Sequence, residues 1–163
     1  MCPAAAPARV LKMTVKDYDF PVSVRWLGRA RTLTTPSGKP PLVVAVPPEF
    51  GGPDGCAWSP EDLLVAATAS SYAVTLAAVS ERRGLPLQAL EVHGVGHVEE
   101  GPEGLAFIAV ELRVEIEADE AWLPAVQEAA RQTEERCLVR RALDMPVLHV
   151  ALELRPAGTK RAA

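Results

Sequence analysis

Residues 59–84 read SPEDLLVAATASSYAVTLAAVSERRG, and this stretch decides how the rest of the chain is arranged. Ser59 is a hydroxyl N-cap, Pro60 suits the first helical position, and Asp62 is a shorter stand-in for the usual Glu of a capping box. The helix is expected to end with two arginines before Gly84, its C-cap. Between its ends the stretch carries almost no charge. Such a helix must be buried by its own domain or by a partner subunit.

The chain before this helix is typical of strands. Its stretches are rich in Val, Leu and Thr and are bounded by Pro or Gly, which indicates an antiparallel meander. A turn is expected at residues 35–38. A glycine-rich loop then leads into the helix. The strands are expected at Arg9–Asp17, Val22–Leu27, Arg31–Thr34 and Leu42–Val46.

The chain after the helix predicts a hairpin, more helix and a final strand. Residues 105–117 alternate apolar and polar side chains and pair with residues 90–99, so one side of the hairpin faces water. A second helical stretch is expected over residues 119–143, broken close to Cys137, before a strand over residues 147–154. Segregated helices and strands in this order predict an α+β fold. The apolar face of the hairpin is expected to hold Ala106, Ile108, Val110, Leu112, Val114 and Ile116.

The length and the net charge limit the class of protein that the chain can belong to. The 163 residues suffice for a single domain, expected to span residues 1–163 with its core at 22–154 and a loose tail at 155–163. The net charge of −4, with both signs dispersed along the chain, does not indicate a basic surface that binds nucleic acid. We see no apolar run near the ~20 residues of a membrane span, and no signal peptide. A cytoplasmic protein that binds neither nucleic acid nor membrane is expected.

The composition also bears on heat tolerance. The chain has no Asn, has Gln only at positions 88, 127 and 132, and has 15 Pro residues. Depletion of amides together with proline-rich loops is typical of thermophile proteins. A GC-rich genome would also favour Ala, Arg and Pro, so thermophily is a hypothesis.

Three cysteines and two strand histidines are the candidate reactive or metal-binding groups. The cysteines, Cys2, Cys56 and Cys137, are too few for a disulfide scaffold, and an isolated cysteine is most often a small buried hydrophobe. His93 and His97 share one face of a strand about 13 Å apart, too far to chelate one metal directly. We expect solvated histidines, no metal site, and no cofactor, since no phosphate loop or dinucleotide fingerprint is present.

Four segments, in this order, resemble the OsmC/Ohr family of thiol-dependent hydroperoxide reductases. The resemblance spans about residues 22–154, and the order of strands and helices agrees with it. It implies the OsmC-like fold, in which antiparallel sheets and long apolar central helices form an intertwined homodimer with two active sites at the interface. The segments are Pro48–Gly52, Ser59–Leu64, Ala66–Tyr72 and Cys137–Leu143.

The resemblance implies a peroxiredoxin-type reaction used in oxidative-stress defence. A thiolate attacks one oxygen of an organic hydroperoxide, the O–O bond breaks, and the sulfur becomes a sulfenic acid. A second cysteine condenses with it to a disulfide, which a dithiol reductant then reduces.

This chain departs from the family at the first of the two cysteines. By position, the attacking cysteine falls on Ser71 and the resolving cysteine on Cys137, which Leu138 follows where the family often has Pro. An alcohol without an adjacent base is scarcely ionised at neutral pH and has no stable equivalent of sulfenic acid. The two-cysteine reaction is therefore absent as the family runs it.

An arginine and a glutamate position the reacting groups in the family. The loop glutamate falls on Glu49. The arginine, which comes from the early strands, fits Arg29 best, with Arg25 and Arg31 close by.

Three functions stay open. In the first, thiol peroxidase activity survives at Cys137 beside Arg136, Arg140 and Arg141, with an external thiol resolving it, or Cys56 swings toward the site. In the second, a non-catalytic dimer binds a small apolar ligand in the former peroxide pocket. In the third, the protein has a structural or partner-binding role. No His–acid pair or Gly-x-Ser-x-Gly motif supports Ser71 as a hydrolytic nucleophile; it is most simply a small residue at a helix crossing.

Overall fold

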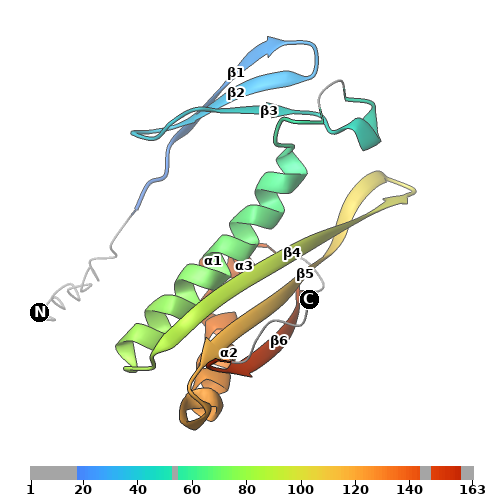
Figure 1. Cartoon of the computed structure of the whole chain (residues 1–163). Helices are drawn as coiled ribbons and strands as arrows, with labels where there is room; N and C mark the ends of the chain where they lie inside the picture. Colours follow the sequence, from blue (N-terminus) through green and yellow to red (C-terminus); the bar gives the residue numbers. More distant parts are fainter. Residues whose placement is uncertain (1–17, 53–54, 144–147, 159–163) are drawn as a thin grey trace, which may run out of the picture.

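The computed structural model describes residues 18–52, 55–143 and 148–158 (Figure 1). The strand expected over Arg9–Asp17 lies outside these ranges, as do Cys2 and the end of the tail. The described elements form two three-stranded sheets and a set of helices. This is the α+β architecture that the sequence predicts.

The N-terminal sheet has the strand order β1-β2-β3, and both neighbouring pairs are antiparallel. Gly28 and Arg29, at the turn between the first two strands, have φ angles of 95° and 51°. Positive φ values of this kind allow a tight hairpin. A short 3-10 helix, η1, follows the sheet and leads into the glycine-rich loop. The bounds are Val22–Gly28 for β1, Arg31–Pro36 for β2, Leu42–Ala45 for β3 and Pro48–Phe50 for η1.

Helix α1 (Pro60–Arg82) connects the N-terminal sheet to the lower body of the molecule (Figure 1). Its N-cap is Ser59, as predicted, and its C-cap is Arg83, one residue before the predicted Gly84. Gly84 follows with φ 66°, the left-handed conformation that commonly ends a helix.

The second sheet has the order β4-β5-β6 and comprises β4 (Leu87–Gly101), β5 (Gly104–Ala118) and β6 (Leu148–Pro156). The first two strands form the expected antiparallel hairpin. Strand β6, however, runs parallel to β5, so the expectation of antiparallel sheets is wrong for this pair of strands. The reason is the helical segment between them, which acts as a crossover and returns the chain to the middle of β5, where Leu148 pairs with Val110.

Three helices are described in the crossover segment. They are η2 (Glu120–Trp122), α2 (Leu123–Arg136) and α3 (Leu138–Ala142). The predicted break near Cys137 is confirmed, because this residue has an extended ψ of 114° between α2 and α3.

The main core lies between the inner face of the second sheet and helices α1 and α2. Both helices therefore cover the same side of the sheet, and its other side carries the charged residues of the hairpin. The buried side chains of this core include Tyr72, Leu76 and Val79 from α1, Val126, Ala129 and Ala130 from α2, and Val110, Leu112, Val114, Ile116 and Ala118 from β5.

The alternation along β5 changes phase near its start. His97 pairs with Ala109, whereas Val98 pairs with Phe107, so Ile108 is an extra residue in the strand. Such a bulge exchanges the two faces for the residues before it. Phe107 turns inward, and Ile108 is exposed. The prediction that Ala106 and Ile108 share the inner face is therefore wrong.

Helix α1 retains much exposed apolar surface. By length and composition it could cross a membrane, so the expectation that no apolar stretch approaches that length is wrong for α1. The core helix of a soluble protein passes the same test, yet only 28% of this apolar stretch is buried within one copy. Val74, for example, is 67% exposed.

Candidate functional site

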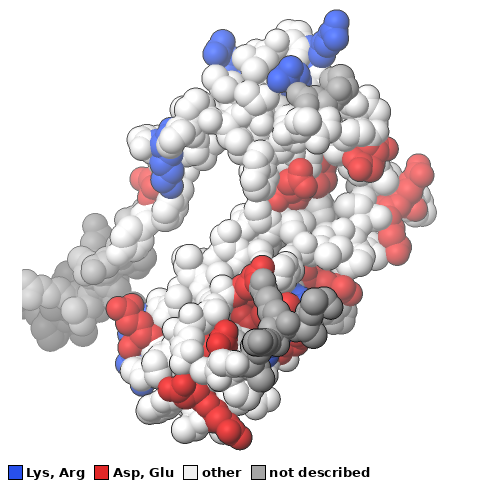
Figure 2. All heavy atoms as spheres, in the orientation of Figure 1, with Lys and Arg blue, Asp and Glu red and all other residues white. Residues whose placement is uncertain are grey.

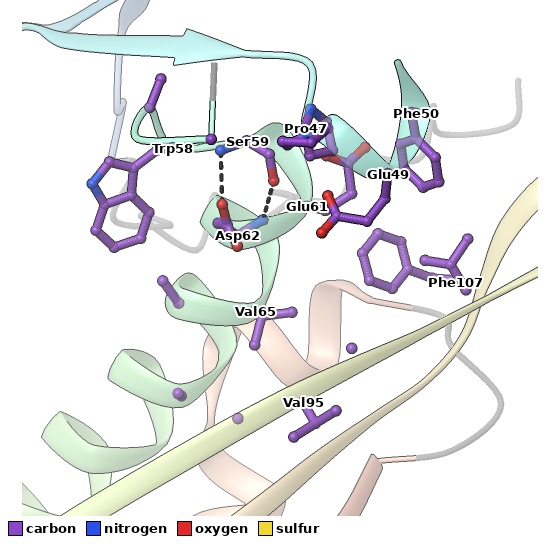
Figure 3. A pocket seen from close by; sticks show the side chains of 18 of the residues that line it. Pro47, Glu49, Phe50, Trp58, Ser59, Glu61, Asp62, Val65, Val95 and Phe107 are labelled. Atoms are coloured by element: carbon purple, nitrogen blue, oxygen red, sulfur yellow. Dashed lines mark hydrogen bonds between the residues drawn. The ribbon is translucent and has the colours of Figure 1, made fainter. Parts of the chain in front are cut away.

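A capping box fixes the first turn of α1. The backbone N–H of Asp62 donates to Ser59 Oγ at 2.9 Å, and the backbone N–H of Ser59 donates to Asp62 Oδ2 at 2.8 Å. This confirms that Asp62 replaces the usual Glu of the box. With its start fixed in this way, the helix presents Glu61 to the space beneath the N-terminal sheet (Figure 3).

A pocket of about 910 Å³ lies in this space. Its walls come from the η1 segment, the loop at residues 55–59, the first three turns of α1, and strands β4 and β5. Phe50, Trp58, Val65 and Phe107 supply much of its apolar surface (Figure 3). An apolar cavity with a few polar groups is the usual form of a small-molecule site.

Besides Asp62 of the capping box, two carboxylates from different elements line the pocket. Glu49 comes from η1 and Glu61 from the first turn of α1, and both side chains turn into the same space (Figure 3). Glu61 Oε2 is shielded from solvent and accepts no hydrogen bond from the residues that the structure describes. Sequence reasoning selected Glu49 and missed Glu61, although its place two residues after the N-cap could have signalled it.

Two glycines of β4 shape the floor of the pocket. A Cβ atom on Gly96 would lie 2.7 Å from both Phe107 Cε1 and Val65 Cγ2, and one on Gly94 would lie 2.8 Å from Val65 Cγ1. The missing side chains therefore let Val65 and Phe107 pack onto the strand. Glycine inside a strand often marks a close approach of this kind.

Ser71 and Cys137 meet on another side of α1. The Cys137 thiol donates to Ser71 Oγ across 3.1 Å, and Cys137 is 0% exposed. Beside them, the Tyr72 hydroxyl donates to the Ala130 carbonyl oxygen at 3.3 Å. Burial raises the pKa of Tyr72 above its ordinary value, and the charges of Glu134 and Cys137 add to this. The pair is therefore an internal contact of the helical core.

The predicted site residues fall in different places. Glu49 lines the pocket, but neither Ser71 nor Cys137 does; Ser70 is the serine that reaches it. Arg29 is exposed at the β1–β2 turn, where its carbonyl oxygen accepts a hydrogen bond from Trp26 Nε1 at 2.7 Å. Within one copy, the four predicted residues are not brought together.

The remaining candidates lie at the edges of the pocket or away from it. Arg25 and Arg31 are exposed on β1 and β2 and do not line the pocket. Cys56 is exposed between Gly55 and Ala57, which both line it.

The strand histidines lie apart from one another on the outer face of the second sheet. His93 Nε2 is 3.4 Å from Glu91 Oε1, and His97 Nε2 is 3.5 Å from Glu111 Oε2. Both histidines are partly exposed, as expected for a polar sheet face. Among the described residues no group of three or more His, Cys, Asp or Glu side chains could hold a metal ion. The side chain of His149 lies outside the described part.

The fold and the pocket together define an α+β protein whose apolar helix joins two sheets beside an acidic, partly aromatic pocket. Residues 51–152 match the family model described as OsmC-like protein. The chain belongs to the OsmC-like family.

Solved structures with the same fold come from several bacteria. An OsmC-like protein of unknown function from Vibrio cholerae has a TM-score of 0.72 at 14% identity, covering 85% of this chain and 100% of that one. An organic hydroperoxide resistance protein OsmC from Legionella pneumophila has a TM-score of 0.67 at 21% identity, covering 84% and 96%. The organic hydroperoxide resistance protein OhrB of Bacillus subtilis has a TM-score of 0.59 at 18% identity, covering 85% and 98%. These similarities show the fold.

A curated relative is similar over a shorter range. The uncharacterized protein YmaD of Bacillus subtilis is 34% identical over 83 residues, which is 50% of this chain and 55% of the relative. The chain thus spans about half the length of the curated relative it matches.

Proposed function

We propose that this protein is an OsmC-fold homodimer of the hydroperoxide-reductase lineage that binds a small apolar ligand in the pocket beside α1. In this proposal the two-cysteine reaction does not occur, because Ser71 stands at the position of the attacking cysteine. A link to oxidative-stress defence is supported by relatives named for organic hydroperoxide resistance.

The observation that carries the proposal is the contact between Ser71 and Cys137. A hydroxyl lies 3.1 Å from the thiol where a two-cysteine enzyme needs a second sulfur, and the thiol is fully buried. Serine cannot form the sulfenic acid on which a resolving cysteine acts. The pocket, by contrast, is open, with apolar walls and space for a small molecule.

The ligand-binding function is tested with 2-phenyl-2-propanol, the alcohol that corresponds to cumene hydroperoxide. Because this alcohol cannot be reduced, its binding is separate from any peroxidase chemistry. Isothermal titration of the full chain is expected to show saturable binding, and Gly96→Ala is expected to weaken it by roughly tenfold, because the added methyl pushes Val65 and Phe107 into the cavity.

The matched control is Gly101→Ala at the end of the same strand. A Cβ there would meet only the Gly104 carbonyl oxygen, at an ordinary 3.9 Å. Binding that is unaffected by Gly96→Ala, or that is weakened equally by both substitutions, would contradict the proposed location.

A second candidate function is thiol peroxidase activity at Cys137 alone. Its support is the position of the thiol between α2 and α3, near Arg140, whose guanidinium donates to the Glu134 carbonyl oxygen at 2.9 Å. Here the thiolate would take one oxygen from the hydroperoxide, release the alcohol, and be reduced by an external thiol. The complete burial of Cys137 opposes it.

The intact mass before and after treatment with cumene hydroperoxide separates the two candidates. The ligand-binding function predicts no oxygen or thiol adduct that depends on Cys137. A rapid adduct in the wild type that is absent from Cys137→Ser would instead support the peroxidase.

The homodimer is supported by apolar surfaces that one copy leaves uncovered. Val74 of α1 is exposed, and so are Val22, Val24 and Trp26, which follow one face of β1. Exposed apolar patches of this extent commonly mark protein–protein interfaces.

Charge is also unevenly distributed along the chain. Residues 22–45 contain four cations and no acid, whereas residues 87–118 contain seven glutamates. In Figure 2 the basic side chains gather on the N-terminal sheet and acidic ones below it. A basic sheet from one copy would complement an acidic hairpin from another.

A further inference from the structure

Phe107 is the aromatic residue of the pocket that the chain itself holds most firmly. It is half-buried and packs against the main core, whereas Phe50 and Trp58 are 43% and 46% exposed. Strand β5 directs Phe107 to this face because Ile108 is an extra residue in the strand. A bulge can re-aim a side chain in this way, and bulges are common beside functional sites.

The neighbours of Phe107 fix how its ring lies. Phe107 Cε1 is 2.7 Å and Cδ1 is 3.5 Å from the point that a Cβ of Gly96 would occupy, and Val65 Cγ2 is 2.7 Å from the same point. One edge of the ring is therefore packed against the glycine and the valine. The ring lies beside the Glu49 side chain, where it borders the pocket (Figure 3).

A ring that is fixed in this way can distinguish between ligands of the same size. Two aromatic rings gain an offset-stacked or edge-to-face contact in addition to the area that they bury, and a saturated ring cannot make this contact. Because the Phe107 ring is already ordered by its neighbours, little conformational entropy is lost when a ligand packs against it. Phe50 enters the same space from η1 and adds a second ring.

We propose that Phe107 determines the specificity of the pocket and that the ligand is an aryl compound whose ring packs against the Phe107 ring. This inference rests on the proposed ligand-binding function and adds to it the chemical class of the ligand and the residue that selects it. The contacts that fix the Phe107 ring all lie within one copy of the chain.

Two alcohols that differ only in the saturation of their ring test the proposal. They are 2-phenyl-2-propanol and 2-cyclohexyl-2-propanol, each titrated calorimetrically into the full chain under the same conditions. The cyclohexyl ring is the larger and more apolar of the two, so the hydrophobic effect alone would favour it. The phenyl alcohol is nevertheless expected to bind roughly threefold to tenfold more tightly, because it alone makes the aromatic contact.

Phe107→Leu keeps an apolar side chain and removes the ring. This variant is expected to bind the two alcohols with affinities within roughly twofold of one another. Ile108→Leu, at the next position of β5, is the matched control; Ile108 does not line the pocket, so the full preference should remain. Thermal unfolding of each variant checks the fold, and Phe107→Ile takes the place of Phe107→Leu if the latter does not fold.

Each outcome bears on a different claim. Equal affinities for the two alcohols in the wild type would overturn the aryl ligand, and the proposed ligand-binding function would stand. A preference for the phenyl alcohol that persists in Phe107→Leu would overturn the role of Phe107. If neither alcohol binds, as expected if a second copy fills the pocket, the proposed function fails and this inference fails with it.

Discussion

The Cys137 thiol donates a hydrogen bond to Ser71 Oγ across 3.1 Å, although the two residues lie 66 positions apart in the chain. The family resemblance assigns these two positions to a pair of cysteines that form a disulfide. In this protein the fold brings the two side chains together, but the pair is a thiol and a hydroxyl. The two side chains therefore lie together as the two cysteines of the family would, but a thiol and a hydroxyl cannot form a disulfide.

The stability of this contact can be measured with two alanine variants. Ser71→Ala removes the acceptor of a buried thiol, whereas Ser70→Ala alters an exposed neighbour with the same change in helix propensity. A thiol is a weak donor, so Ser71→Ala should unfold in urea with a free energy about 0.5–1.5 kcal/mol below that of Ser70→Ala. Equal stabilities would show that the contact contributes nothing.

Because the Tyr72 hydroxyl is buried, we expect the free energy of unfolding to fall at alkaline pH. Burial raises its pKa in the folded state, so the folded protein holds the phenolic proton more tightly than the unfolded chain does. The stabilisation is complete below the ordinary pKa of 10.0 and is lost as the pH rises through the higher folded-state value. Tyr72→Phe should make the free energy of unfolding less dependent on pH above about 10. If the free energy of unfolding falls as steeply with pH above about 10 in Tyr72→Phe as in the wild type, the loss of stability comes from other groups.

The dimer interface should include α1. Replacing exposed Val74 with Glu puts a charge on the apolar surface of this helix, and the expected result is a shift from twice the mass of one chain to the mass of a single chain in light scattering. Val74→Thr, which has nearly the same shape and no charge, should remain dimeric. A Val74→Glu protein that stays dimeric would place the interface elsewhere.

Heat tolerance is a hypothesis drawn from the composition and is the simplest prediction to test. With no Asn and 15 Pro residues, the chain is expected to melt above about 60 °C in scanning calorimetry. A melting midpoint below this temperature would instead attribute the high Pro count and the lack of Asn to a GC-rich genome.

Local signals explain why most of the fold could be predicted. Ser59, Pro60 and Asp62 determine the helix start through contacts within four residues, and Gly84 determines its end. The direction of β6 depends instead on how the crossover helices pack, and the bulge at Ile108 has no signal in the alternation of β5. Long-range packing therefore decided the two points on which the fold prediction is wrong.

The same difference between local signals and long-range packing applies to the candidate site. Position in family motifs identified Ser71 and Cys137, which meet in the structure, and Glu49, which lines the pocket. Glu61 was missed, because its place in the pocket depends on where η1 and β4 lie. Phe107 was missed since the bulge turns it inward.

The most direct test of the account is to restore the missing thiol with Ser71→Cys. The reduced protein is treated with one equivalent of cumene hydroperoxide, and its intact mass and disulfide-linked peptides are measured beside the wild type and Ser70→Cys. The account predicts a rapid disulfide between the introduced thiol and Cys137 in Ser71→Cys, and none involving Cys137 in the wild type or in Ser70→Cys. It would be contradicted if Ser71→Cys formed no such bond, or if the wild type reduced the hydroperoxide as rapidly as the variant.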